Sequence, residues 1–144
     1  MSQEGTFEKV ESSDKKMYGP KGLLVCGYPE PEQLALLSLL KENELSAFPV
    51  IFATNGDIQT TLKQIFAAED RHGQGENSEM TRASIMSGFT QEELHILMES
   101  HKSSNLPTQL WAALTPTSEN WSVIDLLNEL SSEHEAVKKQ RNSP

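Results

Sequence analysis

The segment Lys21-Gly22-Leu23-Leu24-Val25-Cys26-Gly27-Tyr28 recurs about 61 residues later as Arg82-Ala83-Ser84-Ile85-Met86-Ser87-Gly88-Phe89. In both copies a short apolar run ends at a glycine that is followed by an aromatic residue. Further along, residues 50–54 match residues 111–115 at the same spacing. An internal repeat of this size describes an architecture, so it is identified before any smaller motif is interpreted.

Each copy has the pattern of a strand, a helix, a second strand and a second helix. We predict strands at residues 22–28, 48–54, 82–88 and about 109–115. Strands that alternate with helices favour a parallel or mostly parallel sheet. The runs 23–26, 50–53 and 110–114 are apolar at consecutive positions, which is typical of strands covered on both faces.

The repeat therefore predicts an α/β fold, in which two β-α-β-α repeats form one four-stranded, mostly parallel sheet flanked by helices. We expect an approximate two-fold relation between the halves, with Gly27 and Gly88 at matching corners. A two-layer, ferredoxin-like arrangement with extra helices is the alternative. The pattern of the sequence leaves the strand order open.

The domain organisation follows from the same pattern. We predict a disordered tail at 1–21, a single domain at 22–137 made of repeats 22–68 and 82–137, a polar linker at 69–81 and a second tail at 138–144. Residues 55–57 predict a turn that caps the second helix, and Ser122 a cap for the last one. Thr90 and Glu93 have the spacing of a capping box.

Composition excludes several classes of function. The 144 residues carry a net charge of −9, and binding to nucleic acid or to an anionic lipid surface needs basic residues instead. The first repeat is the more acidic half, which either favours a basic partner on that side or serves only to keep the protein in solution. The single cysteine excludes an internal disulfide, and no apolar run approaches the roughly 20 residues that span a bilayer.

Motifs of catalysis are missing from the sequence. Residues 26–29 lack the second and third glycines of a dinucleotide fingerprint, and neither a phosphate-binding loop nor the clustered aspartates of a receiver domain is present. His95 and His101 are six positions apart, which places them on different helix faces and disfavours a metal site. Cys26 is interpreted as a small buried hydrophobe. We therefore expect no enzyme activity, no cofactor and no metal.

One alternative stays open at the carboxyl ends of the strands, where ligands bind in open α/β sheets. These ends carry Cys26, Thr54, Gly88 and Thr115. A pocket formed by these residues would make the chain a small-ligand-binding or enzymatic domain. The other interpretation is that they are turn residues.

Aromatic residues suggest a surface for a protein partner. Tyr28 and Phe89 occupy equivalent positions in the two repeats, and Trp121 begins the last helix. Trp121 either fixes that helix to the core or anchors a partner, where tryptophan is enriched. We predict that a partner contacts Tyr28, Phe89, Thr117, Asn120 and Trp121, and we expect its site where the two copies differ.

Several short stretches resemble a family of domains of unknown function found in bacteria and photosynthetic eukaryotes. They are residues 85–90 with Glu93-Leu94, then Leu110-Trp111-Ala112, and 115–118 with Asn120-Trp121. The similarity is best across about 82–131 and looser in the first repeat. With residues 22–29 included, the chain looks most similar to the plant plastid branch of this family, which assists the assembly of photosystem I.

The resemblance implies a non-catalytic assembly factor or chaperone on the stromal side of the thylakoid. It implies two partners, the stromal iron–sulfur subunit of photosystem I and a membrane-anchored helical-repeat assembly factor. It also implies a location in the chloroplast stroma, peripheral to the thylakoid membrane, with any transit peptide outside this sequence.

Overall fold

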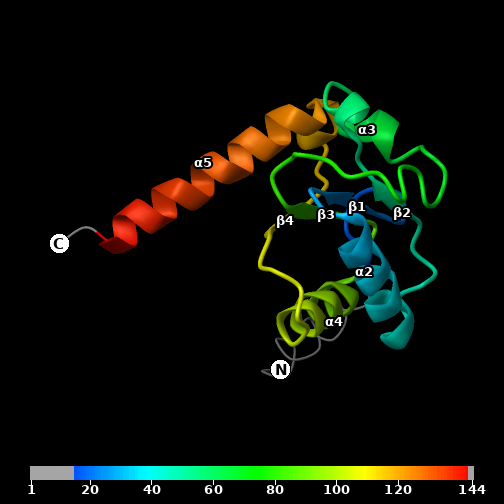
Figure 1. Cartoon of the computed structure of the whole chain (residues 1–144). Helices are drawn as coiled ribbons and strands as arrows, with labels where there is room; N and C mark the ends of the chain where they lie inside the picture. Colours follow the sequence, from blue (N-terminus) through cyan, green and yellow to red (C-terminus); the bar gives the residue numbers. More distant parts are fainter. Residues whose placement is uncertain (1–14, 143–144) are drawn as a thin grey trace, which may run out of the picture.

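The computed structural model describes residues 15–142, with side chains up to Val137 (Figure 1). Its helices, strands and two short 3-10 turns follow the order that the repeat predicts. In chain order they are β1 (Gly22–Cys26), α2 (Glu30–Glu42), β2 (Val50–Phe52), η1 (Asn55–Asp57), α3 (Leu62–Ile65), β3 (Ala83–Ser87), α4 (Gln91–Lys102), β4 (Leu110–Ala113), η2 (Ser118–Asn120) and α5 (Val123–Asn142). None of the helices described is long and apolar enough to cross a membrane.

The four strands form one sheet in the order β2-β1-β3-β4. Strands β1 and β2 are parallel, and so are β3 and β4, whereas β1 and β3 pair antiparallel at the centre. Each parallel pair is one β-α-β unit, and the antiparallel pair joins the two units. The predicted α/β fold with a mostly parallel four-stranded sheet is thus confirmed.

The strand registers confirm the approximate two-fold. Leu23 pairs with Val50 in the first unit, and its counterpart Ser84 pairs with Trp111 in the second. At the centre, Leu24 pairs with Ile85, which is its own counterpart 61 residues later, so the axis passes between these two residues.

The axis continues through the helix starts beneath the sheet. Thr61 and Ser122, also counterparts, form an isolated antiparallel bridge. Two reciprocal bonds flank it: the N–H of Leu62 donates to the carbonyl of Trp121, and the N–H of Val123 donates to the carbonyl of Thr60, both at 2.9 Å. The two halves are therefore tied together by backbone hydrogen bonds as well as by the sheet.

Helices cover both faces of the sheet, which rules out the two-layer alternative. One core holds Leu23, Val25 and Phe52 against α2 and α4. The other core holds Leu24, Ile51 and Ile85 against α3 and the first turns of α5. Successive strand residues point to opposite faces, so strands buried on both sides need apolar residues at every position.

Side chains cap the helices where the sequence predicts it, with one exception. The hydroxyl of Thr90 accepts from the N–H of Glu93 at 3.1 Å, and the carboxylate of Glu93 accepts from the N–H of Thr90 at 2.8 Å. Ser122 accepts from the N–H of Asp125 at 3.2 Å. The exception is the second helix, which begins only at Leu62 and is capped by Thr61, because residues 55–57 form a separate 3-10 turn.

The two corner glycines occupy equivalent left-handed conformations, with φ of +77° at Gly27 and +70° at Gly88. A Cβ on Gly27 would lie 2.9 Å from the backbone nitrogen of Arg82, and a Cβ on Gly88 would lie 2.9 Å from that of Lys21. Both corners therefore require glycine for the same two reasons, backbone conformation and close approach.

Both predicted tails differ from the structure in the residues that it describes. Residues 1–14 and 143–144 lie outside the described residues. However, Lys16 forms a bridge with Thr90, and the N–H of Met17 donates to the carbonyl of Phe89 at 2.7 Å, so the end of the first tail packs on the domain. Helix α5 continues through the second predicted tail to Asn142, because the sequence there has no helix-breaking residue.

Candidate functional site

Polar side chains gather in the core at one corner of the sheet, where β1 ends and β3 and β4 begin. The hydroxyl of Tyr28, which is only 2% exposed, donates to Oε1 of Gln109 at 2.9 Å. The hydroxyl of Ser84 donates to the same oxygen at 2.9 Å. His101, 5% exposed, places Nε2 at 3.4 Å from the Tyr28 oxygen and its ring edge-on to Trp111, with centroids 5.3 Å apart. We call these residues, with Arg82 and Glu32, the polar corner.

A cation covers the polar corner. The guanidinium carbon of Arg82 lies 4.5 Å from the centroid of the Tyr28 ring, within cation–π range. Nη2 of Arg82 also pairs with the carboxylate of Glu32 from α2, and both side chains are mostly buried. Arg82 therefore bridges the start of β3, the end of β1 and helix α2.

Burial fixes the protonation of the polar corner. It raises the pKa of Tyr28 to about 12, although the nearby charge of Arg82 acts in the opposite direction. It lowers the pKa of His101, and the charge of Arg82 lowers it further. At neutral pH the corner thus holds a protonated phenol and a neutral imidazole. The phenol proton is directed to Gln109, and the phenol oxygen lies 3.4 Å from Nε2 of His101.

The two-fold provides an internal control for the polar corner. The counterparts of Tyr28 and Gln109 are Phe89 and Phe48, whose rings stack with centroids 4.0 Å apart. Ser84 and His101 likewise correspond to Leu23 and Leu40, which are fully buried. These four counterparts show that this fold builds the equivalent corner from apolar side chains. The polar residues are therefore not needed for the fold, which makes this corner a candidate for function.

A hollow of about 310 Å³ opens beside the polar corner. Its walls come from the starts of β3 and β4 and from α5, and the residues are Thr81, Arg82, Thr108, Gln109, Leu110 and His134. Two buried donors, Nη1 of Arg82 and Nε2 of Gln109, have no hydrogen-bond partner within the described part of the chain. Both belong to residues that line this hollow.

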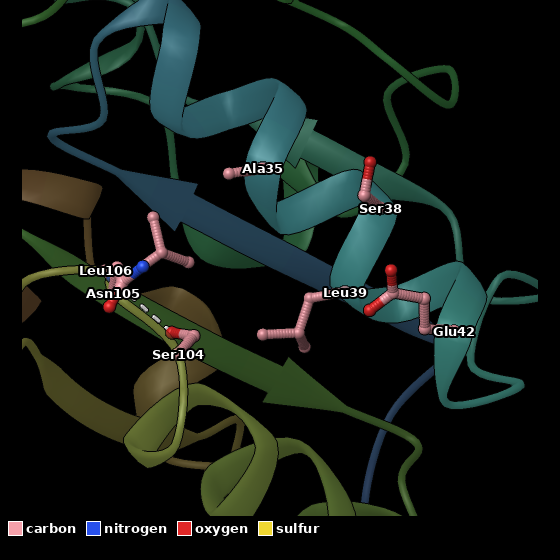
Figure 2. A pocket seen from close by; sticks show the side chains of 7 residues that line it. All are labelled: Ala35, Ser38, Leu39, Glu42, Ser104, Asn105 and Leu106. Atoms are coloured by element: carbon pink, nitrogen blue, oxygen red, sulfur yellow. Dashed lines mark hydrogen bonds between the residues drawn. The ribbon is translucent and has the colours of Figure 1, made fainter.

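A larger hollow of about 450 Å³ lies on the α2–α4 side of the molecule (Figure 2). Figure 2 shows that its lining comes from α2 and from the loop between α4 and β4. The residues are Ala35, Ser38, Leu39, Glu42, Ser104, Asn105 and Leu106. Among the described residues that line it, Glu42 is the only charged one, and they form no cluster of polar groups comparable to the polar corner.

The two outer edges of the sheet differ sharply. At the edge of β2, the predicted linker 69–81 turns back and covers the strand. The N–H of Arg71 donates to the carbonyl of Val50 at 2.7 Å, and the N–H of Phe52 donates to the carbonyl of His72 at 2.8 Å. The carboxylate of Asp70 accepts from the N–H of Val50 at 2.8 Å. The linker is therefore an integral part of the first unit.

The edge of β4 is open within the residues that the structure describes. Leu110 and Leu114 donate to β3, so the alternating pattern directs the backbone groups of Trp111 and Ala113 outward. These residues are the counterparts of Val50 and Phe52. All four residues of β4 are half-buried, whereas the other strands are fully buried.

Helix α5 explains why this edge is open. The counterparts of linker residues 69–81 are residues 130–142, and these stay helical. Figure 1 shows α5 running past β4 and away from the domain. Residues 132–137 are exposed, among them Val137 at 49%.

The predicted partner residues do not form one surface. Tyr28 and Phe89 are 2% and 0% exposed and lie at opposite ends of the sheet, so neither is available to a partner. Trp121 is half-buried and packs against the core beneath α5. Thr117 and Asn120 are exposed in the loop that follows β4, so for them partner binding stays a prediction.

The alternative pocket at the strand ends is not assembled either. Because β1 and β3 run antiparallel, Cys26 and Thr54 lie at one end of the sheet, and Gly88 and Thr115 lie at the other. Burial raises the pKa of the Cys26 thiol to about 12, and the charge of Asp57 adds to this. Such a thiol is a poor nucleophile.

Sequence reasoning missed the members of the polar corner other than Tyr28. Ser84, His101 and Gln109 come from β3, from the end of α4 and from the residue before β4, so no linear motif joins them. The available signal was the repeat itself, since each of the three replaces an apolar residue 61 positions earlier.

Comparison with known proteins finds a family match for one segment of the chain. A domain of unknown function, DUF3783, is found at residues 82–137. These residues are the second repeat, from the start of β3 into α5, and they include the region where the predicted family resemblance is best. No curated protein and no solved structure matches the chain. The open edge and most of the polar corner thus belong to the DUF3783 segment.

Proposed function

We propose that the chain is a non-catalytic assembly factor that binds other proteins, and that one partner adds an extended segment to the edge of β4. The observation that carries this proposal is the difference between the two edges of the sheet. Residues 70–72 of the first unit hydrogen-bond to its edge, whereas no described residue hydrogen-bonds to the outward backbone groups of the equivalent edge in the second unit.

The covered edge indicates the chemistry of the partner. Residues 70–72 provide backbone and carboxylate groups to Val50 and Phe52. A partner strand beside β4 would pair in the same manner with Trp111 and Ala113, and strand addition of this kind is a common mode of peptide recognition. The half-buried Trp111 side chain offers an apolar contact, and Thr117 and Asn120 border the end of the strand.

The family resemblance supports photosystem I assembly as the process. In this proposal the chain acts in the chloroplast stroma, peripheral to the thylakoid, and helps to install the stromal iron–sulfur subunit together with a helical-repeat assembly factor. The net charge of −9 and the acidic first repeat suit a basic partner. The open edge and the acidic first repeat are on different halves, so two partners can bind at once.

The test compares two substitutions at one position of β4. Ala113→Pro removes an outward N–H that the described part of the chain does not use, and proline is tolerated at such edge positions. Ala113→Val keeps the N–H and is the matched control. Circular dichroism and thermal unfolding establish that both variants fold. We expect Ala113→Pro to lose binding of the stromal subunit or of the repeat factor in a pull-down, and Ala113→Val to keep it.

Three outcomes would overturn the proposal. If the wild-type protein binds neither partner, the proposed role in photosystem I assembly is contradicted. If a folded Ala113→Pro variant binds both partners as well as the wild type does, the edge of β4 is not part of the interface. A wild-type chain that dimerises in sedimentation experiments, with dimerisation abolished by Ala113→Pro, assigns the edge to a second copy instead.

A further inference from the structure

The polar corner and the hollow beside it present hydrogen-bond donors without enough acceptors. Gln109 Oε1 already accepts from Tyr28 and Ser84, which leaves its amide N–H groups unpartnered among the described residues. Arg82 uses Nη2 for Glu32, while Nη1 is buried and unpartnered there. A buried donor without an acceptor destabilises the folded state, so two in one place call for a reason.

The other residues of the hollow are compatible with an acceptor entering it. They add two threonine hydroxyls and the His134 imidazole, and none of the lining residues is acidic, in a chain of net charge −9. A carboxylate has two oxygens and accepts charge-assisted hydrogen bonds from arginine. Nη1 of Arg82 and Nε2 of Gln109 are buried beside the hollow, so each would donate to one oxygen once its side chain turns toward the hollow.

From this arrangement we infer that the hollow between β3, β4 and α5 binds a carboxylate group, held by Arg82 and Gln109. The volume of about 310 Å³ suits a small carboxylate or the C-terminal carboxylate of a peptide. The internal control supports a binding role, because the first repeat fills the place of Gln109 with Phe48. The site is separate from the outward edge of Trp111 and Ala113, so it can be tested apart from strand addition.

The experiment titrates the full chain with succinate, with neutral succinamide, and with a tripeptide in its free-acid and amidated forms. Binding is followed by backbone amide NMR shifts at constant ionic strength. We expect saturable shifts at residues 81–82 and 108–110 with succinate or with the free-acid peptide, and none with succinamide or the amidated peptide. Saturation by succinate identifies a free carboxylate as the source, and saturation by the peptide alone identifies a chain terminus.

Variants connect the shifts to the proposed donors. Arg82→Gln removes one charge-assisted donor and is expected to weaken binding about tenfold or more. Lys21→Gln, at the counterpart position, is the matched control and should bind like wild type. Thr108→Val keeps Arg82 in place, so it provides a second lining variant in case Arg82→Gln unfolds, and it should weaken binding measurably.

Four results would overturn the inference. They are an absence of saturation with every carboxylate, equal shifts with the amides, shifts that chloride reproduces, and an unchanged affinity in a folded Arg82→Gln variant.

Discussion

A double-mutant cycle on Tyr28 and Gln109 tests whether the polar corner is one hydrogen-bonded unit. Tyr28→Phe removes a hydroxyl that donates to Gln109 Oε1 at 2.9 Å, and a typical hydrogen bond contributes about 1 kcal/mol. Gln109→Leu instead leaves two hydroxyls, of Tyr28 and Ser84, without their acceptor. At roughly 1–2 kcal/mol for each partly buried orphan, the two orphaned hydroxyls cost about 2–4 kcal/mol, and removal of the unpartnered Nε2 donor of Gln109 offsets part of this cost.

The double variant orphans the Ser84 hydroxyl, and it loses the Tyr28–His101 contact to the same extent as Tyr28→Phe alone, so that loss cancels in the cycle. Its loss of stability should therefore be smaller than the sum of the single losses by about 1–2 kcal/mol, which is the coupling of contacting residues. Urea unfolding at constant m-value measures all four free energies. As a control, Tyr28→Phe combined with Ser122→Ala, which removes a cap on the opposite side of the sheet, should be additive. Additivity of the Tyr28 and Gln109 variants to within about 0.5 kcal/mol would refute the hydrogen-bond geometry.

Two further predictions concern ionisation. Burial and the charge of Arg82 lower the pKa of His101 below the ordinary value of about 6.5, so the unfolded chain binds this proton first. The free energy of unfolding should fall as the pH drops below about 6.5. His101→Leu, which introduces the residue found at the counterpart position Leu40, should make the free energy less dependent on pH in this range. The prediction is contradicted if urea unfolding between neutral pH and pH 5 shows the same pH dependence in the variant as in the wild type. Because burial raises the pKa of Cys26 to about 12, a thiol reagent at pH 8 should label it at the rate of global unfolding, and stoichiometric labelling within seconds in native buffer would contradict this.

The fold was predictable because its determinants are local and occur twice. The apolar runs, the corner glycines and the Thr90–Glu93 capping box each fix one element within a few residues. The strand order was not predictable from these signals. It depends on whether the two β-α-β units join by a parallel or an antiparallel pair, and the contact of Leu24 with Ile85 is non-local.

The candidate site was less predictable for a related physical reason. Tyr28 follows a strand, and by its position it could be exposed or buried. Its burial depends on Arg82 and Gln109, which are 54 and 81 positions away. The polar linker shows the same limitation, since composition indicates a loop but not that Arg71 and His72 pair with β2. The expectation that function lies where the copies differ stays a prediction, and of the residues named for it only Tyr28 belongs to the polar corner.

The two asymmetries of the duplicated fold have a common origin in the segment that follows each unit. In the first unit, residues 70–72 cover the edge of β2. In the second, residues 130–142 stay helical, so the same change that leaves β4 open brings His134 beside Arg82 and Gln109. A single divergence, from an edge-covering loop to a continuous helix, thus accounts for the open edge and completes the donor-lined hollow. It follows that a variant in which α5 ends near Leu130 and continues with residues 70–79 should lose both partner binding and carboxylate binding. If the open edge and the hollow did not depend on the same segment, this variant would lose only one of the two binding activities.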